Sequence, residues 1–357
     1  MLSSDGVEPK LTVIVCTFNR ASKLPVSLNA LAGQTARDQI QVVVVDDGSN
    51  DDTADVAQKY SVDFLRLEVN QGASAARNAG IARARAEFVA FTDDDVEVPP
   101  DWAERLIGSW ERLDPRVTAF GGEVTVAQPN SFTQRYLVSH MPLAPLEIDI
   151  VEDAGFLQRL RSYFRSASHT HGGVRPVYSV VGANMSFRKS ALESIGKFDS
   201  SIRFGGDEVY VCKKLHELFG PETVVCDASL KVAHHFEPGL ADTLRRAYLY
   251  GRAGGRDFAR AGGIPPVRPT SALSALICVS LVPNHLLVGV ASGLVIPYAV
   301  WRVWPREAFQ ERRPSKILYP LVALLEEHVN NLGLVFGWWK EQLAIREFKK
   351  TKLSEEK

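Results

Sequence analysis

The chain has 357 residues and a formal net charge of −1 at pH 7, with 45% hydrophobic and 23% charged residues. This balance excludes bulk electrostatic attraction to nucleic acid, and the apolar content excludes an intrinsically disordered chain. The four cysteines form no CxxC pair, which fits a reducing compartment and predicts neither a disulfide framework nor a zinc site.

The first 125 residues predict alternating strands and helices. Runs of β-branched and aromatic residues indicate strands at Leu11–Cys16, Ile40–Gly48, Phe64–Val69 and Glu87–Phe91. Helical spacing indicates helices around Leu24–Leu31, Thr53–Tyr60 and Ala73–Ala84. This order predicts a doubly wound, mostly parallel α/β sheet with helices on both faces. Ligands of such sheets bind beyond the carboxyl ends of the strands.

The pattern is lost from Gln128 to Pro176 and returns afterwards. Residues 177–220 predict a strand, a helix, a Gly-rich loop and another helix, and TVVC and KVAHHF predict two short strands. A helix is expected over 240–260. The predicted organisation is one domain at 1–240, with halves at about 10–125 and about 126–240, and a helical region at 241–357.

Residues 271–301 carry no formal charge, but Pro283-Asn284-His285 divides them into two pieces. Each piece is shorter than the ~20 residues of a membrane-spanning helix. Arginines flank the run on both sides, so a single span would place one basic flank on the wrong side. We expect a re-entrant or interfacial hairpin; the alternatives are a buried helical pair and a dimer interface. The last segment is amphipathic, and its Lys/Glu-rich tail is expected to be loosely ordered.

Acidic residues follow the predicted strands. Asp46 and Asp47 end the second strand, where a helix-capping turn is the simplest interpretation. In FTDDDVEVPPDW, an extended backbone would direct Asp93 and Asp95 to the same side, and paired carboxylates suit Mg²⁺ or Mn²⁺. Asp101 is expected to be the N-cap of the following helix.

The segment NQGASAARNAG (70–80) follows the third strand. Small residues at a helix start let a phosphate approach backbone N–H groups, and Arg77 would add a bidentate partner. The alternative is an Ala-rich packed helix with one solvated arginine.

Taken together, the stretches VIVCTFNR, VVVVDDGSNDDT, NQGASAARNAG, FTDDDVEVPPDW, GANMSFRKSALESIGKFDSS, GGDE and AHHF resemble the family 2 glycosyltransferases of the GT-A fold. The resemblance runs from about Leu11 to Arg252. It implies an inverting enzyme that needs a divalent metal, Mn²⁺ or Mg²⁺, and a UDP-, GDP- or dTDP-sugar donor. It also implies that 1–240 is the catalytic domain, with the nucleotide-sugar half at about 10–125 and the acceptor half at about 126–240.

The resemblance also implies the roles of particular residues. The metal ligands would be Asp95, Asp93 and His234, although the adjacent His235 is equally placed. The nucleotide would be held by residues of the strand ends: Thr17, Asn19, Arg20, Asp46, Asp47, Arg77, Asp93 and Asp94. Asp207-Glu208 reverses the family's usual Glu-Asp order, so either carboxylate could be the base. We favour Glu208, with Asp207 as the N-cap of the helix.

The predicted function is therefore transfer of a sugar to the hydroxyl of a sugar, polysaccharide or lipid-linked acceptor. Residues 1–10 have no apolar core of a secretory signal, and the expected location is the cytoplasmic face of the cell membrane, with the cytoplasm as second choice. One alternative is a sugar-phosphate nucleotidyltransferase, but CTFNRASKL lacks the Gly-rich basic loop that such an enzyme needs. Another is a non-catalytic nucleotide-sugar-binding membrane protein.

Overall fold

The computed structural model describes residues 8–140, 143–148, 173–260, 262–265 and 318–355. The apolar run at 271–301 lies outside these residues. The described chain divides into two compact units. The first contains residues 8–128, 143–148 and 173–236, and the second contains 129–140, 237–260, 262–265 and 318–355.

The first unit is built on a sheet of nine strands among the described residues, in the order β3-β2-β1-β4-β8-β6-β9-β5, with β7 also paired to β9. One half is parallel, as predicted: β3 (Asp63–Arg66), β2 (Ile40–Asp46), β1 (Leu11–Thr17) and β4 (Phe88–Asp93). The other half is mixed: β8 (Met185–Arg188), β6 (Ala119–Val126), β9 (Val224–His234), β5 (Val96–Glu97) and β7 (Val174–Pro176).

The expectation of a mostly parallel sheet is therefore wrong for the second half. β8 runs antiparallel to both β4 and β6. An apolar run signals that a strand is buried but not its direction, which is set by how the connections cross the sheet.

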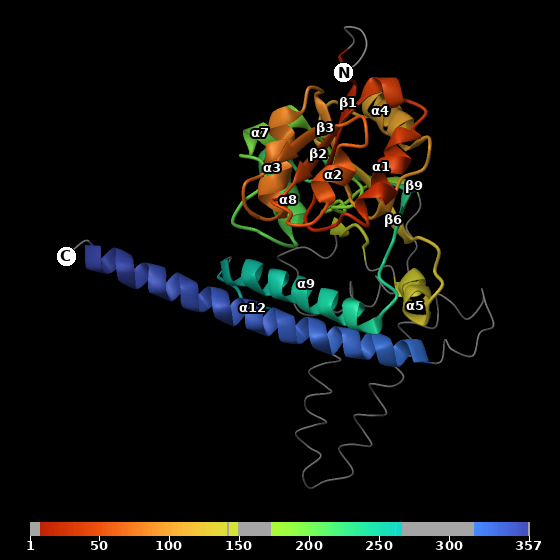
Figure 1. The fold of residues 1–357 in the computed structure, drawn as a ribbon. Helices are drawn as coiled ribbons and strands as arrows, with labels where there is room; N and C mark the ends of the chain where they lie inside the picture. Colours follow the sequence, from red (N-terminus) through yellow and green to blue (C-terminus); the bar gives the residue numbers. More distant parts are fainter. Residues whose placement is uncertain (1–7, 141–142, 149–172, 261, 266–317, 356–357) are drawn as a thin grey trace. The chain divides into compact units, whose positions relative to one another are not determined.

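Helices cover both faces of the sheet, as predicted (Figure 1). Consecutive residues of β1 alternate between two apolar cores, with Val13 and Val15 in one and Ile14 in the other. The first core includes α1 (Leu24–Ala32), α2 (Thr53–Ala57) and α4 (Trp102–Arg112). The second includes α3 (Ala73–Arg83), α7 (Lys189–Ser194) and α8 (Asp207–Phe219). A short 3₁₀ helix, η1 (Arg37–Gln39), precedes β2.

Most of TVVC and KVAHHF belongs to the single strand β9 (Val224–His234), not to two short strands. Its register against β6 shifts between Gly122 and Glu123, because Asp227 pairs with Gly122 while Lys231 pairs with Glu123. At Gly122 an added Cβ would lie 1.8 Å from the Leu230 carbonyl oxygen, so the irregularity requires glycine. The far end of β9 pairs antiparallel with β5.

The second unit contains α5 (Phe132–His140), α9 (Leu240–Arg260) and α12 (Tyr319–Glu355). α9 and α12 pack through glycines: added Cβ atoms at Gly251 and Gly255 would lie 1.9 and 2.0 Å from the carbonyl oxygens of Asn330 and Leu334. Residue numbers rise together along the contact, so the helices are parallel.

The Lys/Glu-rich C-terminal tail is helical as far as Glu355, where α12 ends. Within the described part of the chain, no helix combines the length and the apolar character that a membrane crossing needs.

Candidate active site

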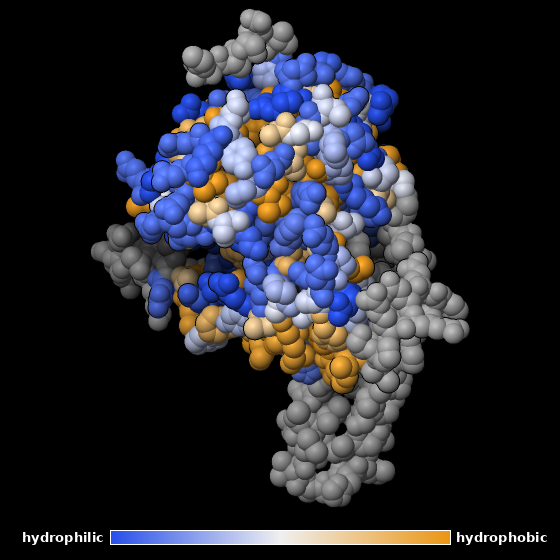
Figure 2. Space-filling view, turned by 45° about the vertical axis from the view of Figure 1, so that its right-hand side comes forward, coloured by the Kyte–Doolittle hydropathy of each residue, from blue (hydrophilic) through white to orange (hydrophobic). Residues whose placement is uncertain are grey.

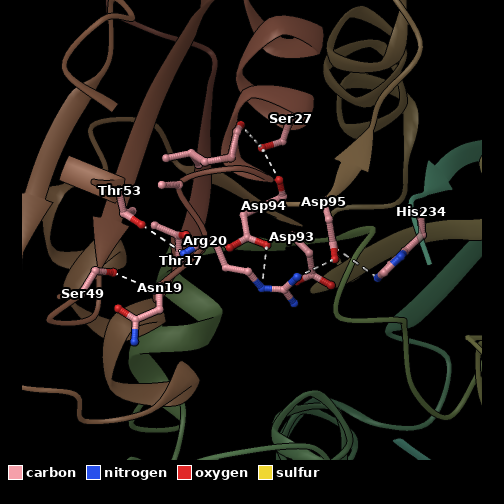
Figure 3. A network of polar contacts seen from close by, with 12 residues as sticks. Thr17, Asn19, Arg20, Ser27, Ser49, Thr53, Asp93, Asp94, Asp95 and His234 are labelled. Atoms are coloured by element: carbon pink, nitrogen blue, oxygen red, sulfur yellow. Dashed lines mark hydrogen bonds and ion pairs between the residues drawn. The ribbon is translucent and has the colours of Figure 1, made fainter. Parts of the chain in front are cut away.

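Two carboxylates and one imidazole converge at the end of β4. Ligand atoms of Asp93, Asp95 and His234 all lie within 4.8 Å of one another (Figure 3). Nε2 of His234 is 3.3 Å from Oδ1 of Asp95. Two carboxylates and an imidazole are donors that a divalent cation such as Mn²⁺ accepts. The geometry therefore fits the metal ligands that the sequence predicts.

The β5–β9 pairing brings His234 to the aspartates. Val96 pairs with His234, and the backbone N–H of His235 donates to the carbonyl oxygen of Asp95 at 2.9 Å. The side chain of His235 turns away, with Nε2 3.1 Å from Oε2 of Glu97. Of the two adjacent histidines, the structure thus places His234 in the cluster.

Asp94, the middle aspartate, points elsewhere. Oγ1 of Thr17 donates to its Oδ2 at 2.7 Å, and Oγ of Ser27 donates to its carbonyl oxygen at 3.3 Å. Burial and the adjacent charge of Asp95 raise the pKa of Asp94 to about 7. Because β4 ends at Asp93, a turn rather than an extended strand brings Asp93 and Asp95 together.

Asp46 and Asp47 fix the loops that follow β2 and β3. The two carboxylate oxygens of Asp47 accept the backbone N–H groups of Gln71 and Gly72, both at 2.8 Å. Oδ1 of Asp46 accepts the N–H of Ser49 at 2.9 Å, while its buried Oδ2 makes no hydrogen bond with the described residues. The structure therefore gives Asp47 a structural role, and Oδ2 of Asp46 forms an ion pair with Nε of Arg66, 3.6 Å away.

Three of the backbone N–H groups at the start of α3 are already used within the protein. Asp47 already occupies the N–H groups of Gln71 and Gly72, and the N–H of Ala73 donates to the carbonyl oxygen of Arg203 at 3.2 Å. Gly72, with φ 96°, packs against Arg203, where an added Cβ would lie 2.8 Å from Cα. The small residues here serve packing.

Arg77 joins the two halves of the site. Its guanidinium forms an ion pair with Asp207 and lies 4.0 Å from Oδ1 of Asp93. It also stacks over the ring of Phe198, 5.7 Å from the centroid. With only 11% of its side chain exposed, Arg77 is neither the solvated arginine of the alternative interpretation nor free to move.

The N-cap prediction for Asp207 is wrong. Gly206, with φ 80°, is the N-cap of α8, and Asp207 is the first helical residue, buried and paired with Arg77. Glu208 is partly exposed, and partial burial and then the charge of Asp207 raise its pKa above the usual carboxyl range. Asp101 does precede α4 as predicted, but its side chain makes no capping hydrogen bond.

The loop after β1 carries the remaining predicted residues, Asn19 and Arg20. Nη1 of Arg20 is 3.4 Å from Oδ2 of Asp95, and Nε is 3.9 Å from Oδ1 of Asp94. Sequence reasoning missed the residues that hold this loop, Ser49, Asp51 and Thr53, because polar residues after a strand are typical of any turn.

A comparison with known proteins matches this chain to one family. The model of glycosyl transferase family 2 matches residues 12–196. Glycosyltransferase AglE from Haloferax volcanii is 28% identical over 205 residues, 56% of this chain and 59% of that protein. The GalNAc(5)-diNAcBac-PP-undecaprenol beta-1,3-glucosyltransferase of Campylobacter jejuni is 40% identical over 96 residues, 25% of this chain and 31% of that protein. The matches thus span less than two thirds of either relative.

The fold is also that of a solved glycosyltransferase. A mannosyltransferase from Pyrobaculum calidifontis, in complex with GDP-Man and Mn²⁺, superposes with a TM-score of 0.52 and 20% identity. The superposition covers 91% of this chain and 88% of that protein.

Proposed function

This chain belongs to glycosyl transferase family 2, and from that premise we propose that it is an inverting, metal-dependent enzyme that transfers a sugar from a nucleotide sugar to an acceptor hydroxyl. The observation that carries the proposal is the convergence of Asp93, Asp95 and His234 at the carboxyl end of β4. A divalent cation held there would supply positive charge to the diphosphate leaving group. The imidazole ligand favours Mn²⁺ over Mg²⁺, because Mg²⁺ prefers oxygen ligands.

The nucleotide of the donor would lie across the ends of β1 and β2. Oδ2 of Asp46 lies 3.6 Å from Nε of Arg66, and a base N–H or a ribose hydroxyl of the nucleotide would share this carboxylate with Arg66. Thr17, Asn19 and Asp94 surround the same strand ends. These contacts are compatible with a UDP-, GDP- or dTDP-sugar.

We assign the proton transfer to Glu208. Its carboxylate accepts the proton of the acceptor hydroxyl while that oxygen forms a bond to the anomeric carbon. The bond from the anomeric carbon to the diphosphate breaks, the diphosphate leaves with the electron pair, and attack from the opposite side inverts the centre. Asp207 is less suited to this role, because it is buried and its charge is committed to Arg77.

We further propose a lipid-linked acceptor, which the name of the Campylobacter relative supports, and a location at the cytoplasmic face of a membrane. α12 exposes large apolar side chains at helical spacing: Leu321, Leu325, Leu332, Phe336, Trp339 and Leu343. Figure 2 shows apolar side chains gathered on this helical unit. Arg245 and Arg252 are exposed on α9 and suit anionic headgroups.

A donor-hydrolysis screen tests the enzymatic proposal without knowledge of the acceptor. The purified protein is incubated with Mn²⁺ or Mg²⁺ and each of several UDP-, GDP- and dTDP-sugars, and release of nucleoside diphosphate is measured. We expect slow, chelator-sensitive release from one donor. Consumption of a nucleoside triphosphate and a sugar phosphate, with release of pyrophosphate, would instead identify a nucleotidyltransferase.

A further inference from the structure

The loop that carries Arg20 has a fixed backbone. The N–H of Asn19 donates to Oγ of Ser49 at 2.8 Å, and the N–H of Arg20 donates to Oγ1 of Thr53 at 3.0 Å. The N–H of Asn50 donates back to Oδ1 of Asn19 at 2.8 Å. Asn19 holds the left-handed conformation, with φ 52°, that this turn needs. The base of the Arg20 side chain is therefore anchored, and only the side chain can move.

The guanidinium of Arg20 lies against the acidic cluster. The two oxygens of Asp95 face different neighbours, with Oδ1 toward His234 and Oδ2 toward Arg20 (Figure 3). Arg77 is the other arginine beside these aspartates, but it is buried and fixed by Asp207. The side chain of Arg20 is 41% exposed, so of these two described arginines it is the one whose guanidinium can move away from the aspartates.

We propose that Arg20 is a built-in cation that neutralises Asp95 in the free enzyme and couples metal binding to donor binding. The inference rests on the metal site of the proposed function. While Arg20 faces Asp95, it lowers the affinity of the cluster for a divalent cation alone, because like charges repel. A diphosphate brings negative charge to the same place, pairs with Arg20, and thereby relieves that repulsion.

The proposal predicts opposite effects on two ligands. An Arg20→Gln variant binds Mn²⁺ alone about three- to tenfold more tightly than the unmodified protein, the size expected for one partly exposed charge. With Mn²⁺ saturating, the same variant binds the nucleoside diphosphate of the donor more weakly. A residue that only supports the loop would change both affinities in the same direction.

The test measures Mn²⁺ binding from the electron paramagnetic resonance signal of the free ion, and nucleotide binding by calorimetry with UDP, GDP and dTDP. Arg20→Lys keeps the charge and is expected to retain most of the wild-type behaviour. Arg85→Gln is the matched control, because Arg85 is an exposed arginine paired with Asp63, away from the cluster, with 57% of its side chain exposed. The Arg20 effect on Mn²⁺ affinity is expected to shrink at high salt.

If wild-type protein binds Mn²⁺ and Asp95→Asn does not, the proposed metal site stands. Two results would then overturn the inference about Arg20 alone. Either Arg20→Gln binds Mn²⁺ no more tightly than wild type, or Arg20→Gln binds the nucleoside diphosphate as tightly as wild type. Failure of wild-type protein to bind Mn²⁺, with or without nucleotide, would overturn the proposed metal site and the inference with it.

Discussion

The carboxylates at the strand ends fall into two groups according to what satisfies their charge. Asp47 accepts two backbone N–H groups and Asp207 is paired with buried Arg77, so the protein itself satisfies both. Asp93 and Asp95 instead lie close together with His234, where their mutual repulsion favours an added cation. Substitutions in the first group should therefore reduce stability, and substitutions in the second should reduce activity.

An Asp95→Asn substitution should abolish transfer and Mn²⁺ binding while changing the free energy of unfolding by less than about 1 kcal/mol. Relief of repulsion from Asp93 and Asp94 offsets loss of the exposed Arg20 contact. Turnover, free Mn²⁺ and thermal unfolding of the metal-free protein measure the three effects. Full, chelator-resistant turnover by this variant would show that the aspartates only turn the chain.

Separate substitutions of Asp207 and Glu208 should have different costs. Glu208→Gln should reduce turnover by roughly 10²-fold or more, as expected for loss of a general base, with donor and metal binding retained. Asp207→Asn should destabilise the fold by about 3–5 kcal/mol, because buried Arg77 would lose the closer of its two carboxylate partners. The comparison uses single-turnover rates and denaturant unfolding. If Asp207→Asn alone stopped transfer in a stable protein, Asp207 would be the base.

The raised pKa of Glu208 predicts the pH dependence of the reaction. Burial and the charge of Asp207 raise this pKa and the nearby charge of Arg77 opposes the shift. Since only the deprotonated carboxylate accepts a proton, kcat/KM should rise with pH through a pKa clearly above the ~4.3 of an ordinary glutamate. Mn²⁺ binding measured over the same pH range is the control. A rate independent of pH from about 5 upward would exclude Glu208 as the base.

At the scale of elements, close backbone contacts decide which strands and helices meet. Gly122 lets β6 approach the irregular part of β9, whose last residue then pairs with β5 beside the aspartates. In the second unit, Gly333 and Gly337 repeat the pattern of Gly251 and Gly255: their added Cβ atoms would lie 2.1 Å from carbonyl oxygens of α9. Both contacts need a residue without a Cβ.

Substitutions at two adjacent glycines of α9 should separate helix packing from helix propensity. An alanine Cβ at Gly255 would lie 2.0 Å from the backbone oxygen of Leu334, whereas at Gly254 it would meet only the tip of the Leu334 side chain at 3.4 Å. Gly255→Ala should therefore destabilise the helix pair by about 1–3 kcal/mol. Gly254→Ala should be neutral or up to about 1 kcal/mol stabilising. Hydrogen exchange of the α9 amides measures the change in stability caused by each substitution. Equal changes for Gly255→Ala and Gly254→Ala would contradict the close packing of Gly255 against α12.

At the scale of the whole molecule, the candidate active site and the exposed apolar side chains of α12 belong to different units. The first unit contains all the residues of the candidate active site, and the second exposes the apolar side chains of α12. Exposed aromatic and aliphatic groups on one side of a helix are typical of interfacial helices. Substitutions of exposed residues in the second unit should therefore change membrane binding without changing the rate of donor hydrolysis.

The 357-residue protein should float with vesicles that contain anionic phospholipid, and a Phe336→Ser, Trp339→Ser double variant should float several-fold less. Both side chains are exposed on α12, and burial of each in the interface contributes about 1–2 kcal/mol. Leu218→Ser is the matched control, because Leu218 is an exposed apolar residue of α8 in the first unit. Donor hydrolysis should be the same in all variants. Protein that never floats would remove the membrane proposal, while equal flotation of all three would assign binding to another surface.

The sequence by itself determined the family, the parallel half of the sheet and most of the candidate ligands, because these depend on local patterns. Asp93 and Asp95 are neighbours along the chain. The strands that precede the strand-end aspartates are predicted from consecutive β-branched residues alone. The sheet order, the direction of β8 and the unity of β9 depended on contacts between distant segments.

Only the tertiary structure decided between neighbouring candidates. His234 rather than His235 faces Asp95 because β9 pairs with β5, and side chains one apart on a strand point to opposite sides. Asp207 is committed to Arg77, 130 positions earlier in the chain, which leaves Glu208 as the candidate base. No local pattern reports a partner at such a distance, because burial and ion pairing arise only when the folded chain brings the two segments together.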